Sequence, residues 1–176
     1  MNINAHGKEN YSYKINPELT GLEKVLSFDD GEIGGRLIIK FKNFDSHSTW
    51  FASFSPGKLI KSSSVAVIST PNPNIVCVFY SGKIYLINTL TTEKLSYKEQ
   101  DVVDVIYDDI NNVLLIFTFV GVSCFDGNEI TWETGRLFLD GFKNYQILQG
   151  EIIIEGLLAN GEERCKLDIR SGKLKL

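Results

Sequence analysis

The sequence holds few of the residues on which catalytic and metal sites usually depend. It has two histidines, three cysteines and one methionine among 176 residues. Neither His6 and His47 nor the cysteines have the spacing of zinc ligands. His47 lies in Asp45-Ser-His-Ser-Thr49, and residues so close together in a turn cannot adopt the separated geometry of a Ser/His/Asp triad. We therefore expect no enzymatic activity, no metal and no cofactor.

Long hydrophobic runs and an excess of basic charge are also missing. Apolar runs such as Val113–Phe117 have the length of a strand, well short of the ~20 residues that cross a membrane. The first ten residues are polar and do not resemble a secretion signal. The 18 basic and 22 acidic side chains give a net charge of −4, which disfavours nucleic acid or an anionic membrane as a partner.

Disulfides are not expected either, because the number of cysteines is odd. All three lie in apolar or alternating stretches, where small buried thiols are common: Cys77, Cys124 and Cys165. A reduced chain without a secretion signal is typical of the cytoplasm, and this is the location that we expect.

What the sequence does contain is a repeat. Four short segments end in a basic residue followed by leucine, roughly every 40 residues, and the residue five positions before each leucine is large and apolar. The segments are Ser55–Leu59, Thr91–Leu95, Glu133–Leu137 and Arg170–Leu174. Turn-forming residues between apolar ones favour a sharp reversal between two antiparallel strands, so we expect each segment to be such a turn.

Short β-branched and aromatic stretches precede each of these turns in the same order. They predict strands separated by turns, over 25–28, 37–41, 50–54, 65–68, 75–79, 84–87, 102–107, 113–119, 122–125, 145–148, 151–155 and 165–169. Residues 11–15 alternate and predict an additional edge strand or a strand that closes the last repeat, while 16–24 is the one stretch that favours a turn or two of helix, with Pro17 at its start.

The predicted fold class is all-β, with antiparallel four-stranded blades. The repeats span about 22–61, 62–99, 100–140 and 141–176, after an N-terminal leader over 1–21. A meander of this size resembles one blade of a β-propeller, and Thr134-Gly-Arg-Leu137 and Ser171-Gly-Lys-Leu174 resemble the turns of quinoprotein-type blades. The resemblance covers about 22–176 and implies a half-propeller or a small propeller. The tryptophan-docking residues and the metal or quinone ligands of catalytic quinoproteins are not matched, so it implies no cofactor.

Acidic side chains at the predicted turns are the candidate binding residues. One set falls in turns between the first and second strands of two repeats, and we expect it to share a rim: Asp29, Asp30, Glu32, Asp108 and Asp109, with Tyr107 nearby as an aromatic anchor. A second set lies on the other rim: Asp45, Glu162 and Glu163. Neither stretch of the first set has the Asp-x-Asp-x-Asp-Gly loop of a calcium site. Solvated turns, a partner-binding patch and a carboxylate pair for catalysis remain alternatives.

Small size, acidic charge and the lack of catalytic motifs together resemble the immunity proteins encoded beside bacterial toxins, including those of contact-dependent growth inhibition. That resemblance implies a cognate toxin as partner, for example a nuclease whose basic active site attracts an acidic inhibitor. The alternative is a propeller-type scaffold or sensor module that self-associates or binds a small ligand. The oligomeric state stays open.

Overall fold

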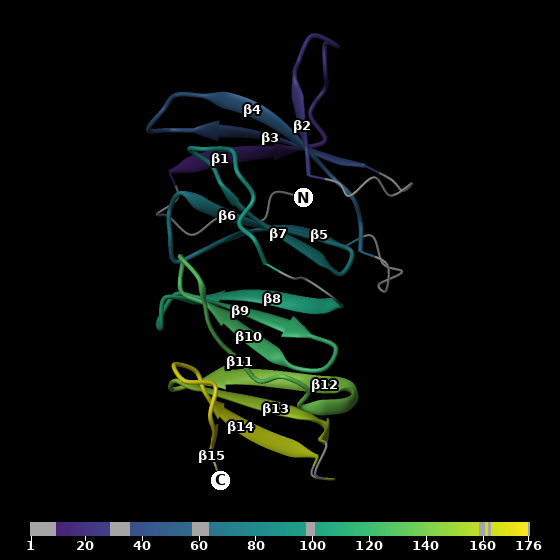
Figure 1. Cartoon of the computed structure of the whole chain (residues 1–176), viewed down its shortest axis with the longest axis vertical. Coiled ribbons are helices and arrows are strands. Elements are labelled where there is room, and N and C mark those ends of the chain that lie inside the picture. Colours follow the sequence, from purple (N-terminus) through teal and green to yellow (C-terminus); the bar gives the residue numbers. More distant parts are fainter. Residues whose placement is uncertain are drawn as a thin grey trace. The chain divides into compact units, whose positions relative to one another are not determined.

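The computed structural model describes residues 10–28, 36–57, 64–97, 101–158, 161 and 163–175 (Figure 1). Within these ranges the chain forms fifteen strands in four sheets, and no described residue is helical. The all-β prediction is thereby confirmed. The described part of the chain has no helix that would be long and apolar enough to cross a membrane. The fold divides into two compact units, which consist mainly of residues 1–100 and 101–176 and are described separately below.

The first sheet of unit 1 has the strand order β1-β3-β4-β2. Its strands are β1 (Tyr11–Ile15), β2 (Val25–Ser27), β3 (Leu37–Asn43) and β4 (Thr49–Phe54). The predicted strand over 11–15 is an edge strand, antiparallel to β3. At the other edge, β2 lies parallel to β4, so this sheet is not the purely antiparallel blade that the repeat predicts.

No helix forms between β1 and β2, contrary to the prediction for 16–24. The carboxylate of Glu23 accepts hydrogen bonds from the backbone N–H groups of Thr20 and Gly21. Gly21 has φ +86°, in the left-handed region, which a right-handed helix cannot contain. Pro17 thus precedes an irregular turn rather than a helix.

The second sheet of unit 1 consists of β5 (Val65–Ser69), β6 (Ile75–Tyr80) and β7 (Lys83–Asn88) in that order. Where the repeat predicts a fourth strand, the residues described up to 97 form only a bridge between Ile87 and Lys94. The turn from β6 to β7 is Ser81-Gly82, and both residues have positive φ. This is the conformation of a two-residue hairpin with the twist that its flanking strands require.

A single core joins the two sheets of unit 1. Phe54 of β4 packs edge to face on Tyr85 of β7, with the ring centroids 5.0 Å apart. The Tyr85 hydroxyl donates to the Ser55 carbonyl oxygen at 2.8 Å, and buried Asn43 donates through Nδ2 to Thr89 Oγ1 at 3.1 Å. Aromatic packing and satisfied buried hydrogen bonds therefore hold these sheets together.

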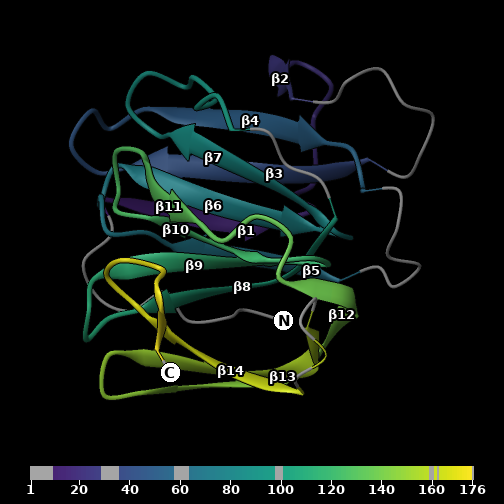
Figure 2. The same cartoon turned by 60° about the horizontal axis from the view of Figure 1, so that its bottom comes forward.

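Unit 2 contains the third and fourth sheets. The third has the order β11-β10-β9-β8, and Figure 2 shows its strands side by side: β8 (Val102–Asp108), β9 (Val113–Thr118), β10 (Val122–Phe125) and β11 (Ile130–Glu133). The fourth has the order β12-β13-β14-β15: β12 (Phe138–Leu148), β13 (Glu151–Leu158), β14 (Arg164–Asp168) and β15 (Leu174–Lys175). Both are antiparallel meanders.

Trp132 of β11 docks on the fourth sheet. Its indole Nε1 donates to the Ile169 carbonyl oxygen at 3.0 Å. A Cβ placed on Gly172 would lie 2.5 Å from Cε3 of the indole, so only glycine allows the ring to approach this closely. The indole of Trp132 therefore docks on the turn between β14 and β15.

The four repeated segments are not equivalent in the structure. Segments 91–95 and 170–174 contribute to the same kind of turn, in which Thr92 and Gly172 donate backbone hydrogen bonds of 2.8 Å to the carbonyls of Asn88 and Asp168. Segment 133–137 instead leads from β11 of the third sheet to β12 of the fourth. Residues 55–57 follow β4, and 58–59 lie outside the described residues.

Candidate functional site

A cleft of about 570 Å³ opens at one end of unit 2, where three turns from its two sheets meet. The turns join β8 to β9, β12 to β13 and β14 to β15, and β15 contributes its own side chain. Ligand sites commonly have volumes of about 300–1,000 Å³. The lining residues combine two carboxylates, two cations and three isoleucines with polar turn residues: Asp108, Ile110, Asn111, Ile147, Gln149, Gly150, Asp168, Ile169, Arg170 and Lys175.

Asp108 holds the β8–β9 turn in place. It is 7% exposed, and its Oδ1 accepts hydrogen bonds from the backbone N–H of Ile110 at 3.0 Å and of Asn111 at 3.4 Å. Its Oδ2 accepts from Asn111 Nδ2 at 2.7 Å. An aspartate that satisfies the N–H groups of the next residues is the usual stabiliser of such a turn. The side chain of Asp108 therefore stabilises this turn. Its contact with a partner stays a prediction.

The tip of this turn presents Ile110 and Asp109 to solvent. Ile110 is 90% exposed, and Asp109 is exposed beside it. The far side of the tip is held by Asn112, which has φ +53° and accepts a hydrogen bond from the Tyr107 hydroxyl at 2.8 Å. Tyr107 is half-buried and supports the turn. An apolar side chain is thus displayed on a backbone that is constrained on both sides.

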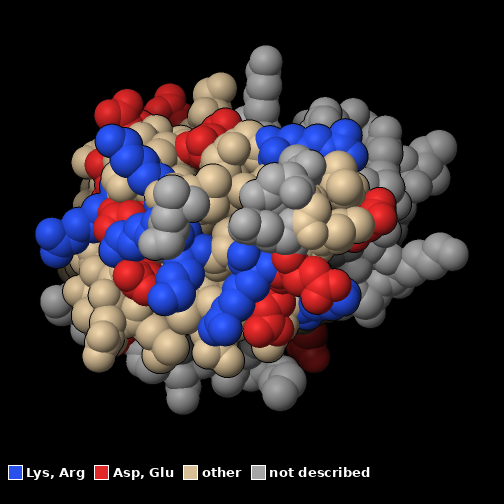
Figure 3. Space-filling model, turned by 90° about the horizontal axis from the view of Figure 1, so that it is seen from below, with Lys and Arg blue, Asp and Glu red and all other residues tan. Residues whose placement is uncertain are grey.

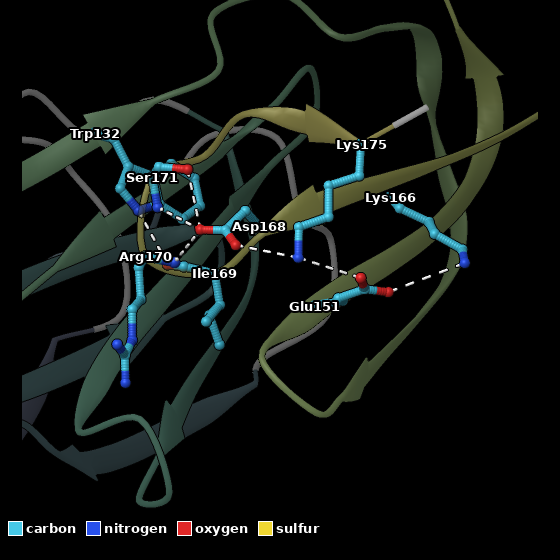
Figure 4. A network of polar contacts seen from close by, with 8 residues as sticks. All are labelled: Trp132, Glu151, Lys166, Asp168, Ile169, Arg170, Ser171 and Lys175. Carbon is cyan, nitrogen blue, oxygen red and sulfur yellow. Dashed lines mark hydrogen bonds and ion pairs between the residues drawn. The ribbon is translucent and has the colours of Figure 1, made fainter.

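The β14–β15 turn is held by Asp168 in the same way. Figure 4 shows its carboxylate facing the turn, where Oδ1 accepts from the backbone N–H of Arg170 at 3.1 Å and of Ser171 at 3.0 Å. The Ser171 hydroxyl donates to the same oxygen at 2.9 Å. The backbone of Ile169 ties this turn to its neighbour, because its N–H donates to the Gly150 carbonyl oxygen at 2.9 Å. Two sides of the cleft are therefore fixed to each other.

An ion-pair network extends from this turn along the fourth sheet. Lys175 Nζ lies 3.1 Å from Asp168 Oδ2 and 3.2 Å from Glu151 Oε1, and Lys166 Nζ lies 3.9 Å from Glu151 Oε2. The hydrogen bond from Lys175 lowers the pKa of the Asp168 carboxyl, and the bonds to Asp168 and Glu151 raise the pKa of Lys175. Figure 3, which views this sheet from below, shows acidic and basic side chains interspersed on the surface.

The predicted site residues that the structure describes belong to different turns and to both units. Asp108 and Asp109 lie on the predicted turn between the first two strands of a sheet, and Asp108 lines the cleft. Asp45 is exposed between β3 and β4 of unit 1, where Oδ2 accepts from Asn10 Nδ2 at 3.0 Å. Glu163 is exposed before β14, at the opposite end of β13 from the cleft. The remaining four lie outside the described residues: Asp29, Asp30, Glu32 and Glu162.

Sequence reasoning missed the cleft and its charged residues Asp168, Arg170 and Lys175. A signal for Asp168 was present, because an aspartate two residues before Arg170-Ser171-Gly172 is typical of a side-chain-stabilised turn. The basic residues carried no comparable signal. Among the described residues, no group of three or more His, Cys, Asp or Glu side chains is placed to hold a metal ion.

Comparison with known proteins gives no family for the chain. It matches no protein-family model and no curated protein sequence. Among solved structures, it is similar to the extracellular domain of a one-component system of B. thetaiotaomicron, with a TM-score of 0.49 and 12% sequence identity. The match covers 85% of this chain but 24% of that one, so the chain spans about a quarter of the neighbour's length.

Proposed function

We propose that the protein is a non-enzymatic, cytoplasmic immunity protein, which binds a cognate bacterial toxin and blocks its active site. The observation that carries this proposal is the tip of the β8–β9 turn. Ile110 is 90% exposed there, on a turn that Asp108 and Asn112 hold in shape. Apolar side chains that are fixed before binding are efficient anchors, because little conformational entropy remains to be lost.

The charge of the chain and of this tip supports a basic partner. The net charge is −4, and Asp109 is exposed beside Ile110. A nuclease holds phosphate groups with Lys and Arg, so its active site attracts an acidic surface and is blocked when that surface docks. In this proposal Ile110 supplies the contact area, while Asp109 and the other exposed carboxylates steer the encounter.

We propose further that the four sheets are successive propeller-like blades. This is supported by the shared geometry of the turns after β7 and β14, where Asn88 and Asp168 each accept two backbone N–H groups through a side-chain oxygen. The paired sheets of each unit, which share one core, also agree with tandem blades.

The function is tested with the protein encoded by the neighbouring reading frame. We expect the two purified proteins to form a complex, and cells that express the neighbour to grow only when this chain is present. A stable complex that does not restore growth would contradict the immunity function, and so would the lack of any complex.

The docking surface is tested separately by variants of the tip. I110D should weaken the complex by at least about tenfold, because a buried contact is replaced by a charge. D109K should slow association, and the effect should shrink at high salt. L22D is the matched control, since Leu22 is 93% exposed and belongs to unit 1, whereas Ile110 belongs to unit 2. Loss of binding in L22D with normal binding in I110D would reject the tip as the anchor.

A further inference from the structure

The cations that line the cleft differ in whether their charge is compensated. Lys175 is shared between Asp168 and Glu151, at 3.1 and 3.2 Å. Arg170 forms no ion pair with any described residue, and it is exposed. Figure 4 shows its side chain pointing away from Asp168 and Lys175. Among the described residues, Arg170 is therefore the lining cation whose guanidinium has no carboxylate partner.

The carboxylates of the cleft are occupied by the protein itself. The oxygens of Asp108 accept three hydrogen bonds from the β8–β9 turn. Asp168 accepts three from the β14–β15 turn and pairs with Lys175. The negative charges of Asp108 and Asp168 remain in the lining and repel an anionic ligand. Arg170 is the one lining cation without a carboxylate partner among the described residues, so it can compensate a single negative charge on the ligand but not two. A singly charged anion fits this balance better than phosphate.

The planar guanidinium adds a geometric preference to this charge balance. It presents its N–H donors as a fork, which matches the two oxygens of a carboxylate. Ile110 and Ile147 line the same cleft, and the side chain of Ile169 points to the same side of the turn as Arg170 (Figure 4). An apolar body attached to the carboxylate therefore has apolar side chains to contact.

We propose that this cleft is a binding site for a small monocarboxylate with an apolar body. The carboxylate binds to the guanidinium of Arg170, and the hydrocarbon part lies against Ile110, Ile147 and Ile169. The volume of about 570 Å³ accommodates a ligand of this class. Binding does not require the protein partner, so the site adds a second ligand to the function proposed above.

The test uses sodium hexanoate as the probe and the full chain labelled with ¹⁵N, at pH 7 and constant ionic strength. We expect saturable shifts of the amide signals of Asn111, Gly150 and Arg170, which lie around the cleft. R170Q should weaken binding by about tenfold or more. It keeps the turn, because Asp168 binds the backbone N–H of Arg170 and not its side chain. R164Q is the matched control, since Arg164 is an exposed cation at the other end of β14.

Two further probes decide the chemistry of the site. Hexylammonium chloride has the same hydrocarbon chain with the opposite charge, and sodium phosphate has negative charge without the chain. We expect neither to saturate the cleft signals at concentrations where hexanoate does. Equal binding of hexanoate to R170Q and the unmodified chain, or equal binding of hexylammonium, would overturn the proposal. The absence of saturable shifts would also overturn it. This holds even if R170Q weakens the complex with a protein partner, because that result would concern the function proposed above and not a small ligand.

Discussion

The hydroxyl of Tyr145 donates a hydrogen bond of 2.6 Å to Oδ2 of Asp104. Tyr145 lies on β12 and Asp104 on β8, so the bond joins the two sheets of unit 2. The Tyr145 ring also stacks on Phe117 of β9, with the centroids 4.1 Å apart. Burial of the hydroxyl is the largest cause that raises the pKa of Tyr145 well above the usual value of 10.0, and the neighbouring carboxylate of Asp104 raises it further.

This contact predicts a loss of stability in alkaline solution. The folded state holds the Tyr145 proton more tightly than the unfolded chain does. The contribution of Tyr145 to the free energy of unfolding is therefore complete below pH 10. It falls as the pH rises further, because the unfolded chain releases the proton at a lower pH than the folded protein does. Y145F removes this titration, so its free energy of unfolding should decline less steeply above pH 10. Urea unfolding of both proteins at pH 7, 9, 10 and 11 measures the difference, and parallel pH profiles would contradict the prediction.

At pH 7 a double-mutant cycle measures the interaction energy between Tyr145 and Asp104. Y145F should lower the free energy of unfolding by about 1.5 kcal/mol, the size expected for a hydrogen bond to a charged group, and D104A should lower it by at least as much, because it also removes the acceptor of the Val105 N–H. The double variant should lose clearly less than the sum, because both changes remove the same bond. Additive losses would show that the two side chains contribute independently.

The third prediction concerns the contact between Gly172 and Trp132. G172A should destabilise the protein by about 3 kcal/mol, because alanine disfavours positive φ and its Cβ overlaps the indole. G135A is the matched control, since Gly135 has φ +64° against +65° at Gly172 but no atom within 4 Å of the added Cβ. It should lose only the backbone part, about 1 kcal/mol. Thermal unfolding compares the two, and equal losses would mean that the indole contact contributes nothing.

The turn after β7 predicts a substitution with the opposite sign. Thr92 has φ +60°, and its backbone N–H bonds to the Asn88 carbonyl as that of Gly172 bonds to Asp168. T92G should relieve the left-handed strain of about 1–2 kcal/mol while it adds about 0.5–1 kcal/mol of unfolded-chain entropy. We expect a net gain of about 0.5 kcal/mol in the free energy of unfolding. A loss of stability would show that the threonine side chain contributes more than its strain costs.

The fifth prediction concerns the turn that carries Ile110. D108A removes the acceptor for two backbone N–H groups and should cost about 2 kcal/mol in a buried position. Amide exchange of Ile110 and Asn111 should accelerate in D108A, while D108N, which keeps one oxygen acceptor, should change it less. Unchanged exchange in D108A would mean that the turn keeps its shape without this side chain.

The strands were predictable because their signals are local. β-branched and aromatic residues alternate, and pairs such as Ser81-Gly82 and Gln149-Gly150 adopt the positive φ values of tight hairpins. The strand β2 was also predicted, but its parallel pairing with β4 was not, since three residues carry no signature of the strand with which they pair. Segment 133–137 has a sequence typical of a hairpin turn. Trp132, which precedes it, docks on the fourth sheet, and the segment connects the third sheet to the fourth instead of forming a hairpin.

The candidate site was less predictable than the strands. The position of Asp108 and Asp109 on a strand-connecting turn follows from the strand pattern. The cleft depends on three turns that are up to sixty residues apart in sequence, and their meeting is fixed by the register of β12 to β14 and the packing of two sheets. No local pattern contains that information, so the sequence indicates Arg170 only as the start of a repeated turn segment and not as a binding residue.

The sheets of both units are assembled from neighbouring stretches of chain, and this affects how the protein is made. Nearly every strand pairs with the one before or after it, and the core of unit 1 is complete once residue 87 has left the ribosome. Domains fold as units during synthesis when their contacts are this close in sequence. Unit 1 can therefore bury the aromatic residues of this core before the C-terminal half exists, which limits the time in which unpaired strand edges are exposed to aggregation.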